Sequence, residues 1–113
     1  MTFRVNSIPE YFETIQKRFN SDAARGVTAT FMFELTGANG GTWTADIKDG
    51  TLTLLTGPVE KPTVHYTMDA GEYLKMANGD LDGTKAYMMR KLKVKGNLMT
   101  AQKFKAILPP GPG

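Results

Sequence analysis

The 113-residue chain is 41% hydrophobic and 22% charged, and it contains no cysteine, which excludes disulfide bonds, thiolate catalysis and cysteine-ligated zinc. Its net charge of +3 is unevenly distributed: the segment from Gly83 onward has seven basic residues and no acidic ones, whereas the preceding residues have seven basic and eleven acidic ones. No apolar run approaches the roughly 18 residues of a membrane-spanning helix, and the N-terminus lacks a signal-type apolar region, so we expect a soluble cytoplasmic protein.

The first predicted element is an amphipathic helix near the N-terminus. Ser7 is a suitable N-cap and Pro9 fits the first helical turn. Apolar residues then recur at helical spacing on one side: Ile8, Tyr11, Phe12, Ile15 and Phe19. A second, short helical piece over residues 21–25 is predicted to end at Gly26, because glycine readily takes the left-handed conformation that closes a helix.

Four strands are predicted next, because the apolar period changes from 3.6 to 2. The first spans residues 27–35, the second spans residues 42–48, and Asp49-Gly50 predicts a tight hairpin into the third. The fourth covers residues 63–68. The apolar face carries Ala29, Phe31, Phe33, Leu35, Trp43, Ala45, Ile47, Leu52, Leu54, Val64, Tyr66 and Met68. We expect these strands to form an antiparallel meander, or an arrangement close to it, with one apolar face.

Helical patterns return after the fourth strand. Asp69 to Glu72 fits a capping box, and Gly79 is predicted to end that helix. A short helix over residues 86–89 and a lysine-rich fifth strand over residues 91–95 follow, and Asn97 is predicted to cap the last helix. The proline- and glycine-rich residues 109–113 cannot continue that helix, so we expect a flexible tail after a single domain of residues 1–108.

One apolar sheet face and several amphipathic helices predict a two-layer α+β sandwich. Residues along nearly the whole chain, from about Ile8 to Leu108, then resemble the sterol carrier protein type two family. The motifs that carry the resemblance are Gly41-x-Trp43, Asp46-x-Lys48-Asp-Gly50, Lys61-Pro62, Gly79-Asp80-Leu81, Ala86-Tyr87-Met88 and Lys91-Leu-Lys-Val-Lys-Gly-Asn97. The resemblance implies a twisted, five-stranded, mostly antiparallel sheet with four or five helices on one face. It also implies an apolar tunnel between the layers for a fatty acid, acyl-CoA, phospholipid or sterol-like ligand.

The chain departs from the family pattern in two places. Arg90-Lys91 stands where the family usually has Gly-Lys, and Met89 precedes it in place of a small polar residue. These residues leave open the ligand's identity and whether Arg90 gates the cavity. The C-terminal Pro-Gly-Pro-Gly also differs from the peroxisomal tripeptide of many eukaryotic members, which favours a stand-alone prokaryotic protein.

The predicted ligand-binding residues are apolar or aromatic side chains on the inner sheet face and the covering helices. They are Phe31, Phe33, Trp43, Tyr73, Leu74, Met76, Ala77, Tyr87, Met88, Met89, Leu98, Met99, Ala101 and Phe104. Flexible thioethers suit a cavity for ligands of variable shape, although methionines that fill gaps in a small core produce the same pattern. A second set is predicted to meet a lipid head group or an anionic membrane: Arg90, Lys91, Lys93 and Lys95. A solvated strand face is the alternative for these cations.

Other functions find less support in the sequence. His65, the only histidine, lies among threonines on the polar strand face and is interpreted as a surface residue. Residues 78–83 imitate the start of a calcium loop, but Met89 occupies the position that requires a bidentate glutamate. We therefore predict no catalytic residue, metal or cofactor, and no nucleic-acid binding, because the cations adjoin an apolar helix rather than stacking aromatics. The alternative function is a protein-interaction or dimerisation module that uses the apolar C-terminal helix; we expect a monomer or a weak dimer.

Overall fold

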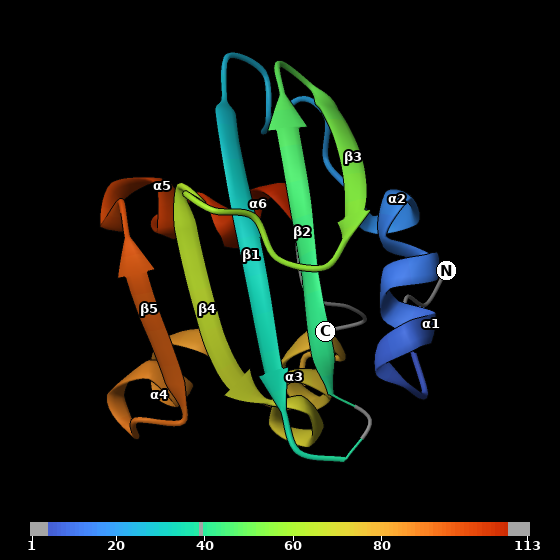
Figure 1. The fold of residues 1–113 in the computed structure, drawn as a ribbon, viewed down its shortest axis with the longest axis vertical. Helices are drawn as coiled ribbons and strands as arrows, with labels where there is room; N and C mark the ends of the chain where they lie inside the picture. The colour runs from blue at the N-terminus through green and yellow to red at the C-terminus, as the bar shows by residue number, and fades with distance from the viewer. Residues whose placement is uncertain (1–4, 39, 109–113) are drawn as a thin grey trace.

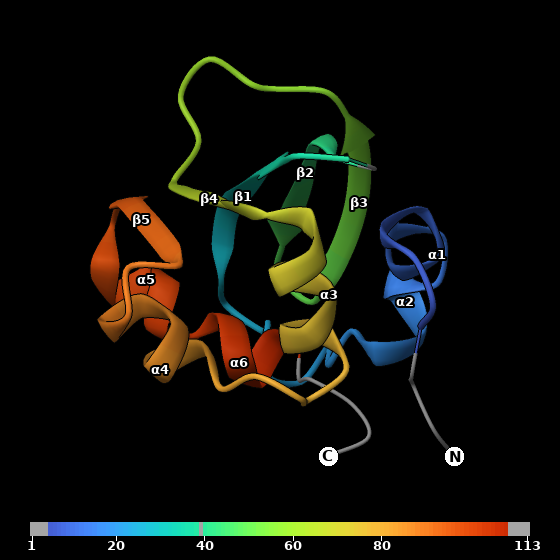
Figure 2. The same ribbon diagram turned by 90° about the horizontal axis from the view of Figure 1, so that it is seen from below.

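The computed structural model describes residues 5–38 and 40–108 and contains one open, five-stranded mixed sheet in the order β3-β2-β1-β4-β5. The helices of these described residues all lie on one face of the sheet (Figures 1 and 2). This arrangement confirms the α+β prediction. The predicted flexible tail, residues 109–113, lies outside the described residues. The strands are β1 Thr28–Thr36, β2 Gly41–Lys48, β3 Thr51–Thr56, β4 Val64–Asp69 and β5 Leu92–Gly96.

The prediction that the first four strands form an antiparallel meander is wrong, because β4 pairs with β1 in parallel. The other three pairs, β1–β2, β2–β3 and β4–β5, are antiparallel. After β3 the chain does not form another hairpin. Residues 57–63 instead cross the helix-free face of the sheet, so that β4 lies beside β1 (Figure 1). Gly57, with a φ of +102°, starts this crossing in a conformation that only glycine adopts easily.

The crossing segment also covers part of the sheet face that the sequence marks as polar. Met32 and Thr44 lie opposite each other in the β1–β2 register, and both are buried. The Thr44 hydroxyl donates a 2.9 Å hydrogen bond to the Gly57 carbonyl, so this buried polar group is satisfied. Thr63 and Thr30 exchange two backbone-to-hydroxyl hydrogen bonds at the far end of the crossing. A half-exposed sheet face thereby gains a small second core.

The helices of the described residues are short, and three of them have a side-chain N-cap. They are α1 Ile8–Glu13, α2 Ile15–Arg18, α3 Ala70–Ala77, α4 Gly83–Met88, α5 Leu98–Gln102 and α6 Phe104–Ile107. The predicted caps are confirmed: the side chains of Ser7, Asp69 and Asn97 each accept a hydrogen bond from a backbone N–H three residues later. None of the helices in the described ranges is long and apolar enough to cross a bilayer.

The predicted helical piece over residues 21–25 is wrong, because these residues form turns. The Ala24 carbonyl accepts hydrogen bonds from the N–H groups of Val27 and Gly50, which ties the segment to the β2–β3 hairpin. Gly26 does take a positive φ of +79°, and its N–H donates a 2.7 Å hydrogen bond to the Asp49 carboxylate. Contacts with a distant hairpin thus hold this segment in turns rather than in a helix.

The core lies between the inner sheet face and the helices. Phe31 and Phe33 of β1 are completely buried at its centre. Tyr66 of β4 and Phe104 of α6 pack against both of them, with ring centroids between 5.2 and 6.3 Å apart. This aromatic cluster joins β1, β4 and α6, and it forms the floor beneath the neighbouring helices.

Candidate functional site

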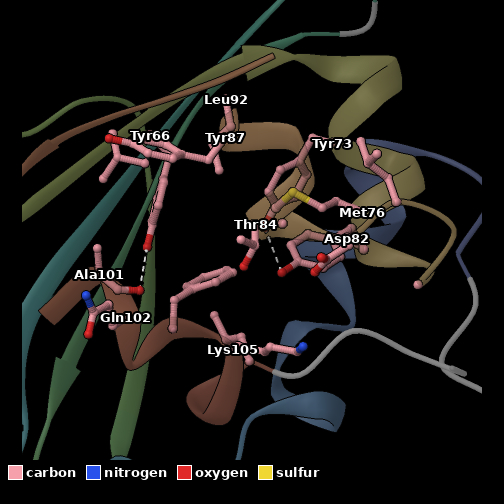
Figure 3. A pocket seen from close by; sticks show the side chains of 18 of the residues that line it. Tyr66, Tyr73, Met76, Asp82, Thr84, Tyr87, Leu92, Ala101, Gln102 and Lys105 are labelled. Atoms are coloured by element: carbon pink, nitrogen blue, oxygen red, sulfur yellow. Dashed lines mark hydrogen bonds between the residues drawn. The ribbon is translucent and has the colours of Figure 1, made fainter. Parts of the chain in front are cut away.

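A pocket of about 780 Å³ lies beside the aromatic cluster, between the helical layer and strands β4 and β5, and is partly open to solvent. Tyr66 of β4 and Leu92 and Val94 of β5 form its sheet side. Residues of α3, α4, α5 and α6 surround it on the helical side, together with the connection that precedes α4 (Figure 3). Tyr11 and Arg18 reach it from the N-terminal helices. Its size lies within the range of ligand pockets, roughly 300–1,000 Å³.

Tyr66 connects the sheet to the helix that covers one end of the pocket. Its hydroxyl donates a 3.2 Å hydrogen bond to the carbonyl of Ala101 in α5 (Figure 3). Its ring lies 5.2 Å from the ring of Phe104. A short helix such as α5 has little stability of its own, so this contact helps to hold the wall of the pocket in place.

A pair of hydrogen-bonded tyrosines, Tyr73 and Tyr11, forms another part of the pocket wall. The hydroxyls of Tyr73 in α3 and Tyr11 in α1 are 2.9 Å apart, and the two rings meet edge to face at 5.2 Å. The guanidinium of Arg18 lies over the Tyr11 ring, 4.8 Å from its centroid, and donates a 2.7 Å hydrogen bond to the Ala77 carbonyl. Arg18 is only 4% exposed, so a buried cation forms part of a largely aromatic wall.

Burial controls the protonation of these tyrosines. It raises the pKa of Tyr11, Tyr66 and Tyr73 above the usual value of a phenol. The neighbouring Tyr11 raises the pKa of Tyr66 and of Tyr73 further. All three phenols therefore remain neutral at ordinary pH and act as hydrogen-bonding walls rather than as bases.

Seven of the fourteen predicted ligand-binding residues line this pocket: Tyr73, Met76, Ala77, Tyr87, Leu98, Ala101 and Phe104. The other seven lie elsewhere. Phe31 and Phe33 are completely buried within the aromatic cluster, and Trp43 stacks on Phe12 at 4.5 Å. Leu74 lines a separate hollow of about 100 Å³, whereas Met88, Met89 and Met99 are exposed.

The predicted head-group cations also lie outside the lining of this pocket. Arg90, Lys93 and Lys95 are exposed, and the Lys91 ammonium lies 3.5 Å from the Glu72 carboxylate. Arg90 has a φ of +62°, which is the left-handed region that favours glycine, and this explains why the resemblance leads one to expect glycine there. Arg90 therefore affects the turn before β5, and the prediction of membrane or head-group contact stays untested for all four.

Several pocket residues are not predicted from the sequence, and Arg18 and Tyr66 are the most informative of them. Arg18 follows Tyr11 and Ile15 at helical spacing, so its place on the apolar side of the N-terminal helices could have been recognised. Tyr66 was placed on the apolar strand face but not in the cavity. Asp82, Gln102 and Lys105 supply further polar groups around the pocket.

His65 lies on the sheet face opposite the pocket and is paired with a carboxylate. Its Nε2 lies 3.0 Å from the Glu34 carboxylate on the adjacent strand. Within residues 5–38 and 40–108, no group of three or more histidine, aspartate or glutamate side chains could hold a metal ion.

The sequence model of the SCP-2 sterol transfer family matches residues 12–109. The chain belongs to this family. Hydroxysteroid dehydrogenase-like protein 2 from Homo sapiens is 32% identical over 106 residues, which cover 93% of this chain and 25% of that protein. The same protein from Xenopus tropicalis is 34% identical over 102 residues, covering 89% and 24%. The chain therefore spans about a quarter of the length of these relatives.

Solved structures of low sequence identity share the fold. The apo form of sterol carrier protein 2 from Yarrowia lipolytica has a TM-score of 0.73 at 21% identity, covering 99% of this chain and 100% of that one. Palmitated SCP2L2 from Aedes aegypti also has a TM-score of 0.73 at 21% identity, covering 91% and 95%. The inverting sec-alkylsulfatase Pisa1 from Pseudomonas sp. scores 0.76 at 20% identity, covering 88% of this chain and 16% of the enzyme.

Proposed function

We propose that this chain binds an acyl lipid in the pocket and carries it without catalysing a reaction on it. The pocket's size and its aromatic and aliphatic walls carry this proposal. Membership of a sterol transfer family, and the palmitated state of a protein with the same fold, support it. We place the carrier in the cytoplasm, because a chain without cysteine needs no oxidising compartment.

The energetics of an acyl chain suit reversible carriage. Burying about 16 carbons yields roughly 0.8 kcal/mol per methylene, or on the order of 12 kcal/mol before opposing terms. Most of this gain is offset, because the ligand and the pocket lose conformational freedom and the bilayer offers the chain an equally apolar surrounding. A net transfer free energy near zero is what loading and unloading both require.

Arg18 favours a ligand with an anionic group. Its guanidinium lies in the pocket wall at 4% exposure, where attraction to a carboxylate is screened much less than in water. Among the four ligand classes that the family resemblance implies, fatty acids, acyl-CoAs and phospholipids all combine an acyl chain with an anionic group, and a fatty acid is the smallest of the three. We therefore propose palmitate-like fatty acids as the first ligands to test.

The pocket residues also favour a carrier over an enzyme. The ionisable groups of its lining are tyrosines, Asp82, Lys105 and Arg18, while His65 lies on the other sheet face. No nucleophile with an adjacent base can be assembled from this described set. The longer relatives bear the names of enzymes, but this chain corresponds to only about a quarter of them.

Two alanines provide a matched test of the pocket. Ala101 lines it, whereas Ala106 in α6 is exposed and does not. Titration calorimetry with palmitate is expected to give at least tenfold weaker binding for Ala101→Phe, because the phenyl ring occupies acyl-chain space, and unchanged binding for Ala106→Phe. Equal binding by both variants would place the ligand elsewhere. Failure of the unmodified chain to take up palmitate, palmitoyl-CoA, phospholipid or sterol would overturn the proposed function.

The role of the ligand's anionic group is tested separately, by comparing a fatty acid with the corresponding alcohol. Palmitate and hexadecanol share the same chain, so the unmodified protein is expected to prefer palmitate about tenfold or more if Arg18 meets the carboxylate. Arg18→Met is expected to remove this preference while retaining hexadecanol binding. A preference that survives in Arg18→Met would assign the carboxylate to another residue, with Lys105 as the next candidate to test.

A further inference from the structure

We propose that α4, β5 and α5 form a docking surface for an anionic lipid bilayer, in which exposed methionines enter the head-group region and lysines hold the lipid phosphates and carboxylates. The inference rests on the proposed function, because it assigns the place where the lipid pocket meets its donor and acceptor membranes. We call this set of residues, from Gly83 to Gln102, the docking surface.

Exposed apolar side chains are concentrated on this surface. Five of the six large hydrophobic residues that are exposed in the described chain belong to it: Tyr87 at 52%, Met88 at 76%, Met89 at 55%, Leu98 at 53% and Met99 at 78%. The sixth, Leu55 on β3, is only 39% exposed. Such a concentration indicates an interaction site, and unbranched thioethers adapt readily to a fluid partner.

The apolar residues adjoin the opening of the pocket. Tyr87 of α4 and Leu98 of α5 are each about half exposed, and both also line the pocket. They therefore form part of its rim. Met88 and Met89 directly follow Tyr87 in the chain, and Met99 directly follows Leu98. The two helices lie near opposite ends of β5, at one edge of the sheet (Figure 1). An acyl chain that leaves past this rim would enter the layer in which the methionines rest.

The charge of the surface complements an anionic bilayer. Lys85 and Arg90 are exposed on α4 and in the turn after it. Lys93 and Lys95 are exposed on the edge strand β5, in register with Thr67 and His65 on the outer side of the sheet, so they border the same edge from its other face. The sequence has no acidic residue from Gly83 onward. Each such cation near an anionic membrane strengthens binding about fivefold. Lys91 contributes less, because Glu72 lies 3.5 Å from its ammonium. The nearest acidic residue in sequence, Asp82, precedes α4 and lines the pocket.

A second copy of the chain is a poorer occupant. In a symmetric dimer the same surface meets itself, so the unbalanced cations of Gly83 to Gln102 would face one another. Like charges that face each other across an interface oppose association. The same charges attract phosphatidylserine, and a bilayer bound at this surface would lie next to the opening of the lipid pocket.

Binding to vesicles tests the docking surface independently of ligand uptake. The full chain is mixed with vesicles of phosphatidylcholine alone or with about one third phosphatidylserine, and the bound fraction is measured by sedimentation. Met88→Ser/Met99→Ser and Lys93→Glu/Lys95→Glu alter the docking surface without altering the pocket lining. Leu55→Ser and Lys48→Glu/Lys61→Glu are matched controls on exposed positions elsewhere.

We expect the protein to bind the phosphatidylserine vesicles, and we expect this binding to weaken at high salt. Binding should be about 25-fold weaker or more for Lys93→Glu/Lys95→Glu, because each lysine contributes about fivefold. It should be severalfold weaker for Met88→Ser/Met99→Ser, which buries less apolar surface in the bilayer, and unchanged for the controls. Palmitate uptake from solution should remain normal in every variant, whereas transfer between vesicles should slow in the docking-surface variants. Equal vesicle binding by all variants would overturn the inference while normal palmitate uptake still upheld the proposed function. A stable dimer that Met88→Ser/Met99→Ser dissociates would assign the surface to a second copy and would likewise overturn it.

Discussion

The Tyr73 hydroxyl donates a 2.9 Å hydrogen bond to the Tyr11 hydroxyl, and both side chains are fully buried where α3 meets α1 at the pocket wall. Residues 62 positions apart in the chain are thereby fixed against each other. The Arg18 guanidinium packs on the Tyr11 ring and binds the carbonyl of Ala77 at the end of α3. The wall is therefore a cross-connected unit of α1, α2 and α3, whose parts are expected to respond together to substitution.

Tyr73→Phe is expected to lower the free energy of unfolding by about 1–2 kcal/mol, because the buried Tyr11 hydroxyl loses its donor. Urea denaturation measures the change. Tyr11→Phe and the double variant complete a cycle, in which the coupling between the two hydroxyls should be about 1 kcal/mol. Strictly additive costs would show that this hydrogen bond contributes nothing.

Stability is expected to fall at alkaline pH. Tyr11, Tyr66 and Tyr73 have raised pKa values in the folded chain because they are buried, whereas in the unfolded chain they titrate near 10.0. Above that pH the unfolded chain releases protons that the folded chain retains. The free energy of unfolding should therefore fall by up to about 1.4 kcal/mol per pH unit for each phenol.

Tyr66→Phe isolates one of these contributions. Below pH 10 the variant should be less stable by about 1 kcal/mol, because the hydrogen bond to Ala101 is lost. Above that pH the deficit should shrink, because phenylalanine cannot ionise. Urea denaturation at a series of pH values follows the difference, and a deficit that does not change with pH contradicts the assignment.

Asn78 connects the N-terminal segment to the end of α3. Its side chain accepts a 2.7 Å hydrogen bond from the Val5 N–H and donates one of 2.9 Å to the Val5 carbonyl. Asn78→Ala should cost about 2–3 kcal/mol, because it leaves two buried backbone groups unpaired. Asn20→Ala, which removes one exposed hydrogen bond to Ala23, should cost less than about 1 kcal/mol. Equal losses of unfolding free energy in the two variants would mean that the buried hydrogen bonds of Asn78 stabilise the fold no more than an exposed one.

Arg90 adopts a φ of +62° between α4 and β5, which costs a non-glycine residue about 1 kcal/mol. Arg90→Gly removes this strain but makes the unfolded chain more flexible, so stability should rise by up to about 1 kcal/mol. Lys85→Gly, inside α4, should instead lower stability by about 1 kcal/mol. Thermal or urea denaturation distinguishes the two, and a marked loss of stability in Arg90→Gly would refute the strain.

The sequence predicted the secondary structure well where the pattern is local. Alternation identified each strand, the caps at Ser7, Asp69 and Asn97 were correct, and Asp49-Gly50 marked the hairpin. The parallel pairing of β4 was not predictable locally, because it depends on how residues 57–63 cross the sheet. The turns at residues 21–26 likewise depend on a distant hairpin.

The pocket was predicted only in part, because alternation shows which face is apolar but not how closely helices cover it. Phe31 and Phe33 face inward, yet they are completely buried against Tyr66 and Phe104 and do not line the pocket. Met88 and Met99 belong to short helices, and Met89 caps the end of α4, and no periodicity determines the orientation of such short elements. Trp43 packs on Phe12 and does not line the pocket. The fluorescence emission of this tryptophan is therefore a poor indicator of whether the pocket holds a ligand.

Native mass spectrometry of the chain purified from cells tests the central proposal most directly. The account predicts a fraction of molecules carrying one lipid of acyl-chain mass, displaced by added palmitate and absent from Ala101→Phe but retained in Ala106→Phe. A chain that carries no lipid, and remains unliganded after incubation with palmitate, palmitoyl-CoA, phospholipid and sterol, would contradict the account.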